Sequence, residues 1–392
     1  MPKILAGYSI AAIISFSSVS LVSSLSQPQP IANMIELEPN PPIWPSSVKI
    51  IHESLGMEAI KDMLQETQDS WNETGQTFTC DHHFSSRRWA LLFAPGTYSG
   101  IDLEIGYYVQ IAGLGTSPDQ VQFVDCDKGP HVPALNRHLH EHGTCLDTFW
   151  RSAKNFASHA TQGMKWAVSQ AAPLRRVHVG KDLYLHDHGA YASGGHLANA
   201  KIDGHVFAGG QQQYLMRNVE FQGGSSGGAW GMVHVGCTGQ VPESSTGNET
   251  SPSITVIETP KIRIEKPYVA LQDDGMRFEL RVPLPLFHPE TNVGPLFDGS
   301  MEEARDFASV RVVRSDESPS RIQEALNEGK DVVLAPGIFY LDKTLEMKSP
   351  NQVLLGLGLA SLVAPSNGTP CIHVEPRVAG VRIAGTITQI QR

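Results

Sequence analysis

Apolar positions in this chain follow a pattern that occurs twice. Residues 91–115 and 332–358 each contain an apolar run, the tripeptide Ala-Pro-Gly, two short strand-like segments and a Gly-Leu-Gly turn. Each copy follows a segment with helical spacing, at residues 57–67 and 319–328. A strand, a Pro-Gly turn and a second strand are how a parallel β-helix begins, and a preceding helix covers its open end. The repeat therefore predicts one β-helix and the beginning of a second.

Short apolar segments also recur between the two copies, about every 17 to 25 residues. Each segment starts with a large apolar residue, alternates apolar and polar positions, and is bounded by Gly or Asn. These segments lie at residues 149–156, 174–179, 197–202, 215–221 and 232–235. Their spacing predicts stacked turns of one solenoid that share an apolar column. Arg151, Arg176 and Arg217 each come two residues after an opening apolar residue, and we expect them to form an outward, solvated row.

The pattern divides the chain into successive regions of an all-β fold. We expect a signal peptide at 1–26, an extended Pro-rich arm on the first domain at 27–56, a first β-helix at 57–240, a connector at 241–307 and an incomplete second β-helix at 308–392. Alternating strands around Asp273-Asp274-Gly275 predict an antiparallel hairpin in the connector, packed between the two β-helices. Ser320 is the predicted N-cap of the second helical segment.

The first residues have the pattern of a secretory signal. Lys3 precedes an apolar stretch at 4–22, and small residues follow before Gln27. A membrane anchor is the competing interpretation, but the Ser-rich and Pro-rich sequence that follows favours cleavage. We therefore expect a secreted, extracellular protein with no membrane contact after cleavage. Glycosylation sequons at Asn72, Asn248 and Asn367 agree with export.

Composition narrows the classes of partner. The formal net charge of −10 argues against nucleic acid, because phosphate binding needs a basic surface. The chain has 5 cysteines without CxxC spacing, so a zinc site is not expected. They allow two disulfides and one thiol, and Cys126 with Cys145 is one candidate pair among several.

The densest group of candidate binding residues lies at 183–236, where apolar strand segments alternate with Gly-rich loops that display Asp, His, Gln, Tyr and Trp. Aromatic faces stack on sugars, and amides and carboxylates bind sugar hydroxyls, so this stretch favours sugar recognition. Gln211 and Gln213 stand two residues apart and are predicted to share one strand face. The alternative is a polar ladder with no ligand. Three carboxylates are candidates for glycoside cleavage, and spacing singles out none of them: Asp187, Asp203 and Glu220.

Two histidine clusters are candidate metal sites. His186 and His188 would share a strand side, whereas a solvated turn is the simpler interpretation of His186-Asp187-His188. His138, His140 and His142 lie in a polar loop with no third shaped ligand. Residues 223–228 are Gly-rich but lack the Gly-Lys-Ser/Thr of a phosphate loop. We therefore expect no metal and no other cofactor.

Several longer runs together carry a family resemblance. The chain resembles secreted double β-helix proteins similar to the exo-β-1,3-glucanases of glycoside hydrolase family 55 over about residues 91–385. The runs that carry it are FWRSAKNFA, MKWAVSQAAPLRRVHV, GAYASGGHLANAKIDG, GGQQQYLMRNVEF, PKIRIEKPYV, ALNEGKDVVLAPGIFYLDKTL and VLLGLGLASLVAP. The resemblance implies right-handed, pectin-lyase-like β-helices in tandem, a β-glucan substrate in the cleft between them, and inverting hydrolysis.

The resemblance also assigns roles to residues. It implies that a glutamine-bearing strand of the first β-helix holds the attacking water, which points to Gln211 and Gln213. It makes Asp187, Tyr191, His196 and Trp230 candidate substrate-binding residues. It places the glutamate general acid in the second β-helix, beyond Arg392. We therefore expect a truncated chain with impaired activity, since losing a general acid typically costs about 10² to 10⁴ in rate.

Three functions remain open at this point. The first is a monomeric β-1,3-glucan hydrolase that this chain represents in part. The second is a carbohydrate-binding or structural β-helix without catalysis. The third is a pectate-lyase-like enzyme, although the clustered carboxylates of a calcium site are not evident in the sequence.

Overall fold

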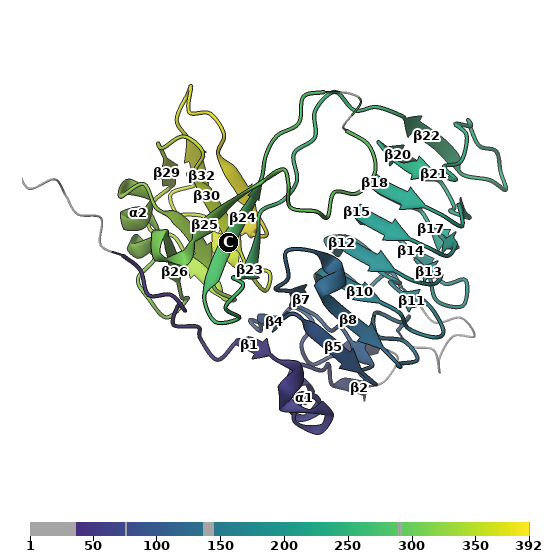
Figure 1. Ribbon diagram of the computed structural model, residues 1–392, viewed down its shortest axis with the longest axis horizontal. Coiled ribbons are helices and arrows are strands. Elements are labelled where there is room, and N and C mark those ends of the chain that lie inside the picture. The colour runs from purple at the N-terminus through teal and green to yellow at the C-terminus, as the bar shows by residue number, and fades with distance from the viewer. Residues whose placement is uncertain (1–36, 75–76, 136–144, 289, 291, 392) are drawn as a thin grey trace, which may run out of the picture. The chain divides into compact units, whose positions relative to one another are not determined.

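The computed structural model describes residues 37–391 except 75–76, 136–144, 289 and 291, and residues 37–392 form one compact unit. The predicted signal peptide and the histidines at 138, 140 and 142 lie outside the described residues. Nearly all the described secondary structure is β-strand (Figure 1). None of the helices in the described ranges is long and apolar enough to cross a membrane.

The first β-helix is built on one long parallel sheet (Figure 1). Its strands pair in the order β1 (Val48–Ile51), β4 (Trp89–Phe93), β7 (Val109–Gly113), β10 (Ser152–Ser158), β12 (Pro173–Val179), β15 (His196–Ile202), β18 (Gln213–Phe221), β20 (Gly231–Val235) and β22 (Ser253–Ile257). The strand β22 was expected to belong to the antiparallel connector. It pairs in parallel with β20 instead, so the first β-helix continues beyond residue 240.

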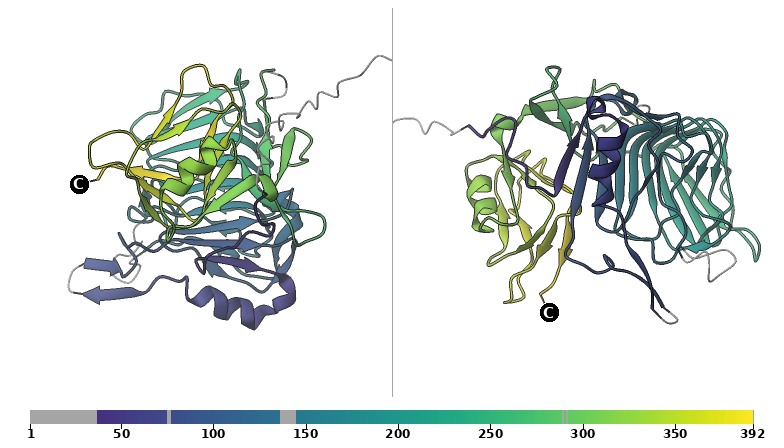
Figure 2. Two further views of the ribbon diagram at one scale, coloured as in Figure 1. Left: turned by 90° about the vertical axis from the view of Figure 1, so that its left-hand side faces the viewer. Right: turned by 90° about the horizontal axis from the view of Figure 1, so that it is seen from below.

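Shorter strands complete the turns. A second stack consists of β11 (Met164–Lys165), β13 (Leu183–Tyr184), β16 (Val206–Phe207) and β19 (Ser225–Ser226). A third stack pairs β14 (Tyr191–Ala192) with β17 (Gly210–Gln211). The remaining short pairs are β5 (Gly96–Ser99) with β8 (Val121–Val124), β6 (Leu103–Glu104) with β9 (Pro130–His131), and β21 (Thr238–Gly239) with β18. The right-hand view of Figure 2 shows the strands of the first β-helix, in blue and teal, as successive layers.

Stacked side chains fill the solenoid. Leu174, Leu197 and Met216 are register partners on β12, β15 and β18, and all three are buried. Burying one such side chain contributes about 1.5–3 kcal/mol. One turn alone could not bury them on both sides, so the predicted apolar column stabilises the stack.

The long sheet bends along a column of left-handed residues. Asn155, Arg176, Asn199 and Asn218 follow matched positions of β10, β12, β15 and β18 and adopt φ between +52° and +57°. Asn tolerates this conformation better than most residues because its short polar side chain bonds locally. The bend interrupts the alternation of side chains along each strand.

This bend and its contacts make the expected row of solvated arginines wrong. Arg151 is fully buried and donates to the carbonyl of Ile105. Arg176 is 7% exposed and lies in the left-handed column. Arg217 stands in register with Ala198 and Arg175, one position before the column that contains Arg176. The three arginines that were expected in one row therefore occupy different places in the turn.

The candidate disulfide is absent from the structure, whereas the first predicted helix is present. Among the described residues, Cys126 and Cys145 are not joined by a disulfide. Cys126 belongs to the main core, whereas Cys145 lies in a separate small alanine-rich cluster. The helix α1 (Met57–Gln65) forms where helical spacing predicted it and packs Ile60 and Leu64 into the main core. The 3₁₀ turn η1 (Glu53–Leu55) precedes it, and β2 (Trp71–Thr74) and β3 (Thr77–Cys80) form an antiparallel pair after it.

The connector is a three-stranded antiparallel sheet. Its strands are β23 (Tyr268–Leu271), β24 (Phe278–Pro283) and β25 (Glu302–Asp306). The predicted hairpin is present: Asp274 Oδ1 accepts hydrogen bonds from the amides of Met276 and Arg277, and Gly275 has φ +67°. Only glycine adopts that conformation at little cost.

The second β-helix repeats the opening of the first. Its sheets are β26 (Val310–Val313), β27 (Asp331–Leu334), β30 (Val353–Gly356) and β33 (Arg382–Ala384); β28 (Ile338–Tyr340), β31 (Ser361–Val363) and β34 (Ile387–Gln389); and β29 (Leu345–Met347) with β32 (Ile372–Val374). The helix α2 (Ser320–Asn327) stands between β26 and β27, as α1 stands between β1 and β4. The predicted N-cap is wrong, because Pro319 holds that position and Ser320 is the first helical residue.

An apolar cluster shared by the two β-helices and the connector lies between the separate interiors of the two β-helices. Ala90 and Leu92 of β4 face this shared core, whereas Leu91 and Phe93 face the interior of the first β-helix. The β4 strand is therefore apolar on both faces, as expected of a parallel strand buried on both sides. The other members of the shared core include Ala112, Leu114, Val269, Leu280, Val312, Val333, Val353 and Leu355.

The N-terminal arm differs from expectation. Residues 48–51 of its predicted range form β1 of the first β-helix, as a place on the first domain requires. The described residues before β1 contact the connector and the second β-helix instead, because Trp44 packs against Phe278 and Phe307. The carboxylate of Glu38 forms ion pairs with Arg311 and Lys330. The arm therefore helps to hold the second β-helix against the connector.

Candidate functional site

One corner of the first β-helix carries a row of polar and aromatic side chains. We call it the corner row, and its members are Trp150, Gln170, Ser193, Gln213 and Trp230. They lie just before or at the start of β10, β12, β15, β18 and β20. Main-chain hydrogen bonds join neighbouring turns here, from Trp150 N to Gln170 O, from Gln212 N to Ala192 O and from Trp230 N to Gln212 O. Gln170, Gln213 and Trp230 are exposed.

The polar members of the row converge at Gly194. Gln170 Nε2 donates to Ser193 Oγ at 3.2 Å. A Cβ built on Gly194 would lie 3.8 Å from Gln213 Nε2 and 3.9 Å from Gln170 Cγ. Gly194 has φ +82°, so a residue with a side chain would be strained there, and its Cβ would touch both glutamine side chains at ordinary van der Waals distance. Two amides and a hydroxyl from three successive turns therefore face the same small space.

Aromatic rings flank this polar group. Tyr191 is 65% exposed and Trp230 is 64% exposed. Trp150 stacks on Tyr108 with ring centroids 5.4 Å apart. The guanidinium of Arg88 lies over the Tyr108 ring, 3.9 Å from the ring centroid. Arg88 Nε also donates to Leu359 O and Ser361 Oγ in the second β-helix. The corner row therefore lies on the side of the first β-helix that contacts the second.

His196, the predicted substrate-binding histidine, lies next to this row on the outer face of β15. Burial lowers its pKa to about 4, and the nearby Arg175 and Arg217 act in the same direction. Its Nδ1 is 3.3 Å from Arg175 Nη1. The ring is therefore neutral near pH 7 and accepts a hydrogen bond from the guanidinium.

Gln211 and Gln213 do not share a face, contrary to expectation. Gln211 is fully buried, and its Nε2 donates to the carbonyls of Val168 and Leu185 inside the solenoid. Gln213 is exposed. The chain turns a corner at Gln212, between β17 and β18, so strand alternation does not extend across the pair.

Asp187 is also placed differently from expectation. It is 1% exposed, accepts a hydrogen bond from the amide of Ala134 and pairs with Lys165. His188 has φ +50°, so the chain turns at His186-Asp187-His188 and no extended strand runs through it. Within the described ranges, no group of three His, Cys, Asp or Glu side chains is arranged to hold a metal ion.

The other candidate carboxylates lie away from the corner row. Asp203 follows β15 and accepts from His178 Nε2, and Glu220 lies near the end of β18 with Gln222 Nε2 as a donor. Both are at the opposite ends of the strands that the corner row begins. Gln170 and Ser193 were missed because their spacing of 23 residues becomes meaningful only when the length of one turn is known.

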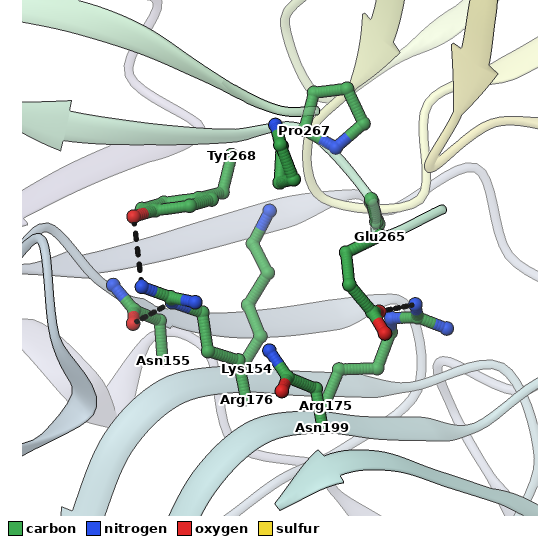
Figure 3. Close-up of a pocket in the computed structure, with 10 residues that line it drawn as sticks. Lys154, Asn155, Arg175, Arg176, Asn199, Glu265, Pro267 and Tyr268 are labelled. Carbon is green, nitrogen blue, oxygen red and sulfur yellow. Dashed lines mark hydrogen bonds and ion pairs between the residues drawn. The ribbon is translucent and has the colours of Figure 1, made fainter. Parts of the chain in front are cut away.

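A buried charge cluster lies behind the row, between the long sheet and the connector (Figure 3). Glu265 pairs with Arg175, Arg217 and Arg263 at 3.0 to 3.2 Å. Burial alone would raise the pKa of Glu265, but the three guanidinium groups outweigh it and hold that pKa below its usual value. Glu265 is therefore ionised near neutral pH and is unsuited to donate a proton.

The structure describes the side chains of two of the three predicted glycosylation sites and the backbone of the third. Asn248 and Asn367 are exposed, and each Oδ1 accepts hydrogen bonds from the Thr two residues later, Thr250 and Thr369. The backbone of Asn72 belongs to β2. Glycosylation at all three remains a prediction.

Fold and corner row together define the class: a pectate-lyase-like parallel β-helix with a polar and aromatic corner next to a second β-helix. Residues 310–391 match the family model of the LAM55 pectate lyase-like domain. The chain is homologous to a glycoside hydrolase, the Exo-beta-1,3-glucanase of Streptomyces sp. (strain SirexAA-E / ActE). The two are 36% identical over 313 residues, which cover 78% of this chain and 48% of that protein.

Solved structures agree with this relationship. The structure of sacteLam55A from Streptomyces sp. SirexAA-E matches with a TM-score of 0.76 and 30% identity, covering 91% of this chain and 62% of that one. A variant of the same protein, solved in complex with glucose, matches with a TM-score of 0.76 and 30% identity over 90% of this chain and 59% of that one. The predicted β-helix fold and the resemblance to exo-β-1,3-glucanases are confirmed. The chain spans about half the length of the curated relative.

Proposed function

We propose that this chain is a β-1,3-glucan-active protein of the glycoside hydrolase type. The observation that carries the proposal is the corner row, which offers exposed rings and converging amides on a β-helix homologous to an exo-β-1,3-glucanase. We also propose that the protein is exported and glycosylated, as the N-terminal sequence and the exposed Asn248 and Asn367 favour.

In this proposal the rings and the amides have separate tasks. Tyr191 and Trp230 stack on the apolar faces of glucose units, since flat aromatic side chains bury much apolar area against a sugar ring. Gln213, Gln170 and Ser193 bind hydroxyls or hold a water molecule next to the sugar. Gln213 takes the water-positioning role in place of the buried Gln211, whose amide nitrogen is fully used within the solenoid.

The row positions a sugar and a water molecule and supplies no proton donor. Inverting hydrolysis needs a protonated carboxyl group across the bond from the activated water. Glu265 lies close behind His196 and Arg175 but is ionised and ion-paired. We therefore assign positioning roles to the corner row and leave the general acid outside it.

A second candidate function also fits these positioning roles. A β-helix that binds β-glucan without cleaving it would also use exposed rings and amides, and the ionised Glu265 favours that alternative for the described residues. The two functions differ in one measurable product, glucose released from laminarin.

The experiment measures laminarin binding and glucose release for the 392-residue chain, and for a version extended in frame by the sequence that follows Arg392. Binding with glucose release by either version supports the hydrolase. Binding without release by both versions supports the non-catalytic alternative. Absence of binding by both versions would contradict the proposal.

Substitutions locate the binding site. Tyr191→Ala and Gln213→Ala should each weaken laminarin binding about tenfold, which corresponds to about 1.4 kcal/mol. Tyr340→Ala is the matched control, because this tyrosine is 61% exposed and lies on β28 of the second β-helix. Equal losses in Tyr191→Ala and Tyr340→Ala would argue against the corner row as the site.

A further inference from the structure

A small cavity between the long sheet and the connector is lined by four cationic residues and one carboxylate among its ten lining residues. Lys154 comes from β10, Arg175 from β12, and Glu265 and Lys266 from the segment that precedes β23. Its volume is about 20 Å³, room for roughly one water-sized occupant. A sugar or a phosphate group would not fit.

Lys154 points into this cavity without a partner. The residue is 5% exposed, and its Nζ has no hydrogen-bond partner among the described residues. In Figure 3 its side chain ends in the middle of the pocket, away from the dashed lines that join its neighbours. Burial lowers the pKa of Lys154 to about 8, with Arg175 acting in the same direction. A buried, unpaired ammonium is costly and needs a compensating group.

Lys266 is a second lysine that lines the cavity, and it is partly buried. A Cβ built on Gly385 would lie 3.0 Å from Lys266 Nζ, so this side chain also reaches the second β-helix. Burial lowers the pKa of Lys266 well below its usual value, and the charges of Lys154 and Arg175 lower it further.

The carboxylates nearby are already engaged. Glu265 serves Arg175, Arg217 and Arg263 and also accepts from Asn218 Nδ2 at 2.9 Å. Glu302 pairs with Arg176 and accepts from the Tyr268 hydroxyl at 2.6 Å. His196 is neutral near pH 7, since its pKa is about 4. Protonated Lys154 would therefore leave a buried positive charge without a partner, and protonated Lys266 would add a second, partly buried positive charge at the same cavity.

We propose that this cavity is a binding site for one small monovalent inorganic anion, such as chloride, held between the ammonium groups of Lys154 and Lys266. The anion supplies the negative charge that the engaged carboxylates do not. It joins β10 of the first β-helix to the connector and, through Lys266, to the second β-helix. The site is independent of the corner row and of glucan binding.

The test compares thermal unfolding of the full chain in sodium chloride and in sodium gluconate at equal ionic strength. Gluconate is too large for the cavity, so it controls for screening. A ligand that binds only the folded state raises the Tm with its concentration. We expect the Tm to be higher by at least about 2 °C in 0.5 M chloride than in 0.5 M gluconate. Crystals soaked in bromide should show an anomalous peak between the two amines.

Substitutions make the test specific. Lys154→Met and Lys266→Met keep an unbranched side chain that is one heavy atom shorter and remove its charge, and each should abolish the difference between chloride and gluconate. Two variants are needed in case one does not fold. Lys181→Met is the control, since Lys181 is exposed, and it should keep the wild-type difference. Equal Tm values in the two salts, or a chloride effect that survives both substitutions, would overturn the proposal, as would crystals without the bromide peak.

Discussion

At the scale of single residues, the column at the bend of the long sheet combines backbone strain with hydrogen bonds to distant segments. Asn199 has φ +52°, and its Oδ1 accepts from Leu296 N at 2.7 Å and from Arg263 Nη2 at 2.8 Å. Asn is tolerated at this φ, and its amide also fixes the connector. One side chain therefore shapes the turn and attaches a segment almost a hundred residues later.

Asn199→Ala should lower the free energy of unfolding by about 3 kcal/mol, because Arg263 Nη2 and the Leu296 amide lose the acceptor Asn199 Oδ1 and because a Cβ-bearing residue without local hydrogen bonds then stands at positive φ. Urea unfolding followed by circular dichroism measures the change. Asn199→Gly loses the same hydrogen bonds without the strain, so its loss should be about 1 kcal/mol smaller. Equal losses in the two variants would contradict a strain component.

His234 carries a second prediction at the residue scale. It is 2% exposed, and burial lowers its pKa to about 4. The unfolded state then binds more protons than the folded state between pH 6.5 and pH 4, so stability falls as the pH falls through this window. The lowered pKa of His234 should reduce the free energy of unfolding of the wild type by about 3 kcal/mol as the pH falls from 6.5 to 4. His234→Leu should remove that part of the acid loss.

The control for this prediction is His373→Gln. His373 is exposed and pairs with Glu346, so its removal should leave the acid loss from His234 in place. Denaturant unfolding at several pH values from 7 to 4 gives both curves. Parallel curves for wild type and His234→Leu would show that His234 does not titrate as stated.

At the scale of elements, the connector is held to the long sheet by buried charges. The carboxylate of Glu265 bridges Arg175 of β12, Arg217 of β18 and Arg263 of the connector itself. Arg176 adds hydrogen bonds to the carbonyls of Leu296 and Thr116. Arginines that look like surface residues in the sequence are therefore the attachment points of the connector.

Glu265→Gln should lower the free energy of unfolding by about 3–5 kcal/mol, because the buried Arg263 and the partly buried Arg175 and Arg217 lose their common carboxylate. Urea unfolding at pH 7 measures the loss. Glu258→Gln is the control, since Glu258 is exposed, and it should change stability by less than about 0.5 kcal/mol. A loss for Glu265→Gln as small as that of the control would mean that the cluster contributes little.

The limits of sequence reasoning follow from the same contacts. The helices α1 and α2, the Ala-Pro-Gly strands and the Asp-Asp-Gly hairpin depend on local signals and were predictable. The place of Arg176 depends on the connector, about 90 to 120 residues later, and on a positive φ that strand periodicity does not register. Gln211 and Gln213 were assigned to one face because nothing local marks Gln212 as a corner. The positions of Gln170 and Ser193 in the candidate site likewise needed the turn length.

At the scale of residues 37–392 as a whole, each β-helix has its own interior, and a third apolar cluster joins the two. Strands β4 and β7 place Ala90, Leu92 and Ala112 in a core that also contains Val333 and Leu355. Gly358 N donates to Gln110 Oε1 at 3.2 Å, which adds a polar contact at the same place. The opening turns of the two β-helices are therefore one structural element.

Leu92→Ala should destabilise both β-helices, by about 3 kcal/mol from the lost burial and the cavity. Hydrogen exchange followed by mass spectrometry should show faster exchange in peptides that cover 331–356 as well as 89–113. Leu183→Ala is the control, because Leu183 is fully buried in the interior of the first β-helix alone. Exchange at 331–356 that responds equally to both substitutions would contradict a local coupling through β4.

Strand β4, apolar on both faces, has a consequence for protein engineering. Either half of the molecule expressed alone would expose a contiguous hydrophobic patch to water. The patch would contain Ala90 and Leu92 in the first half, or Val333 and Leu355 in the second. Such halves should aggregate and be poorly soluble. The two β-helices therefore cannot be exchanged singly between related proteins. A chimera would have to carry both opening turns from the same parent.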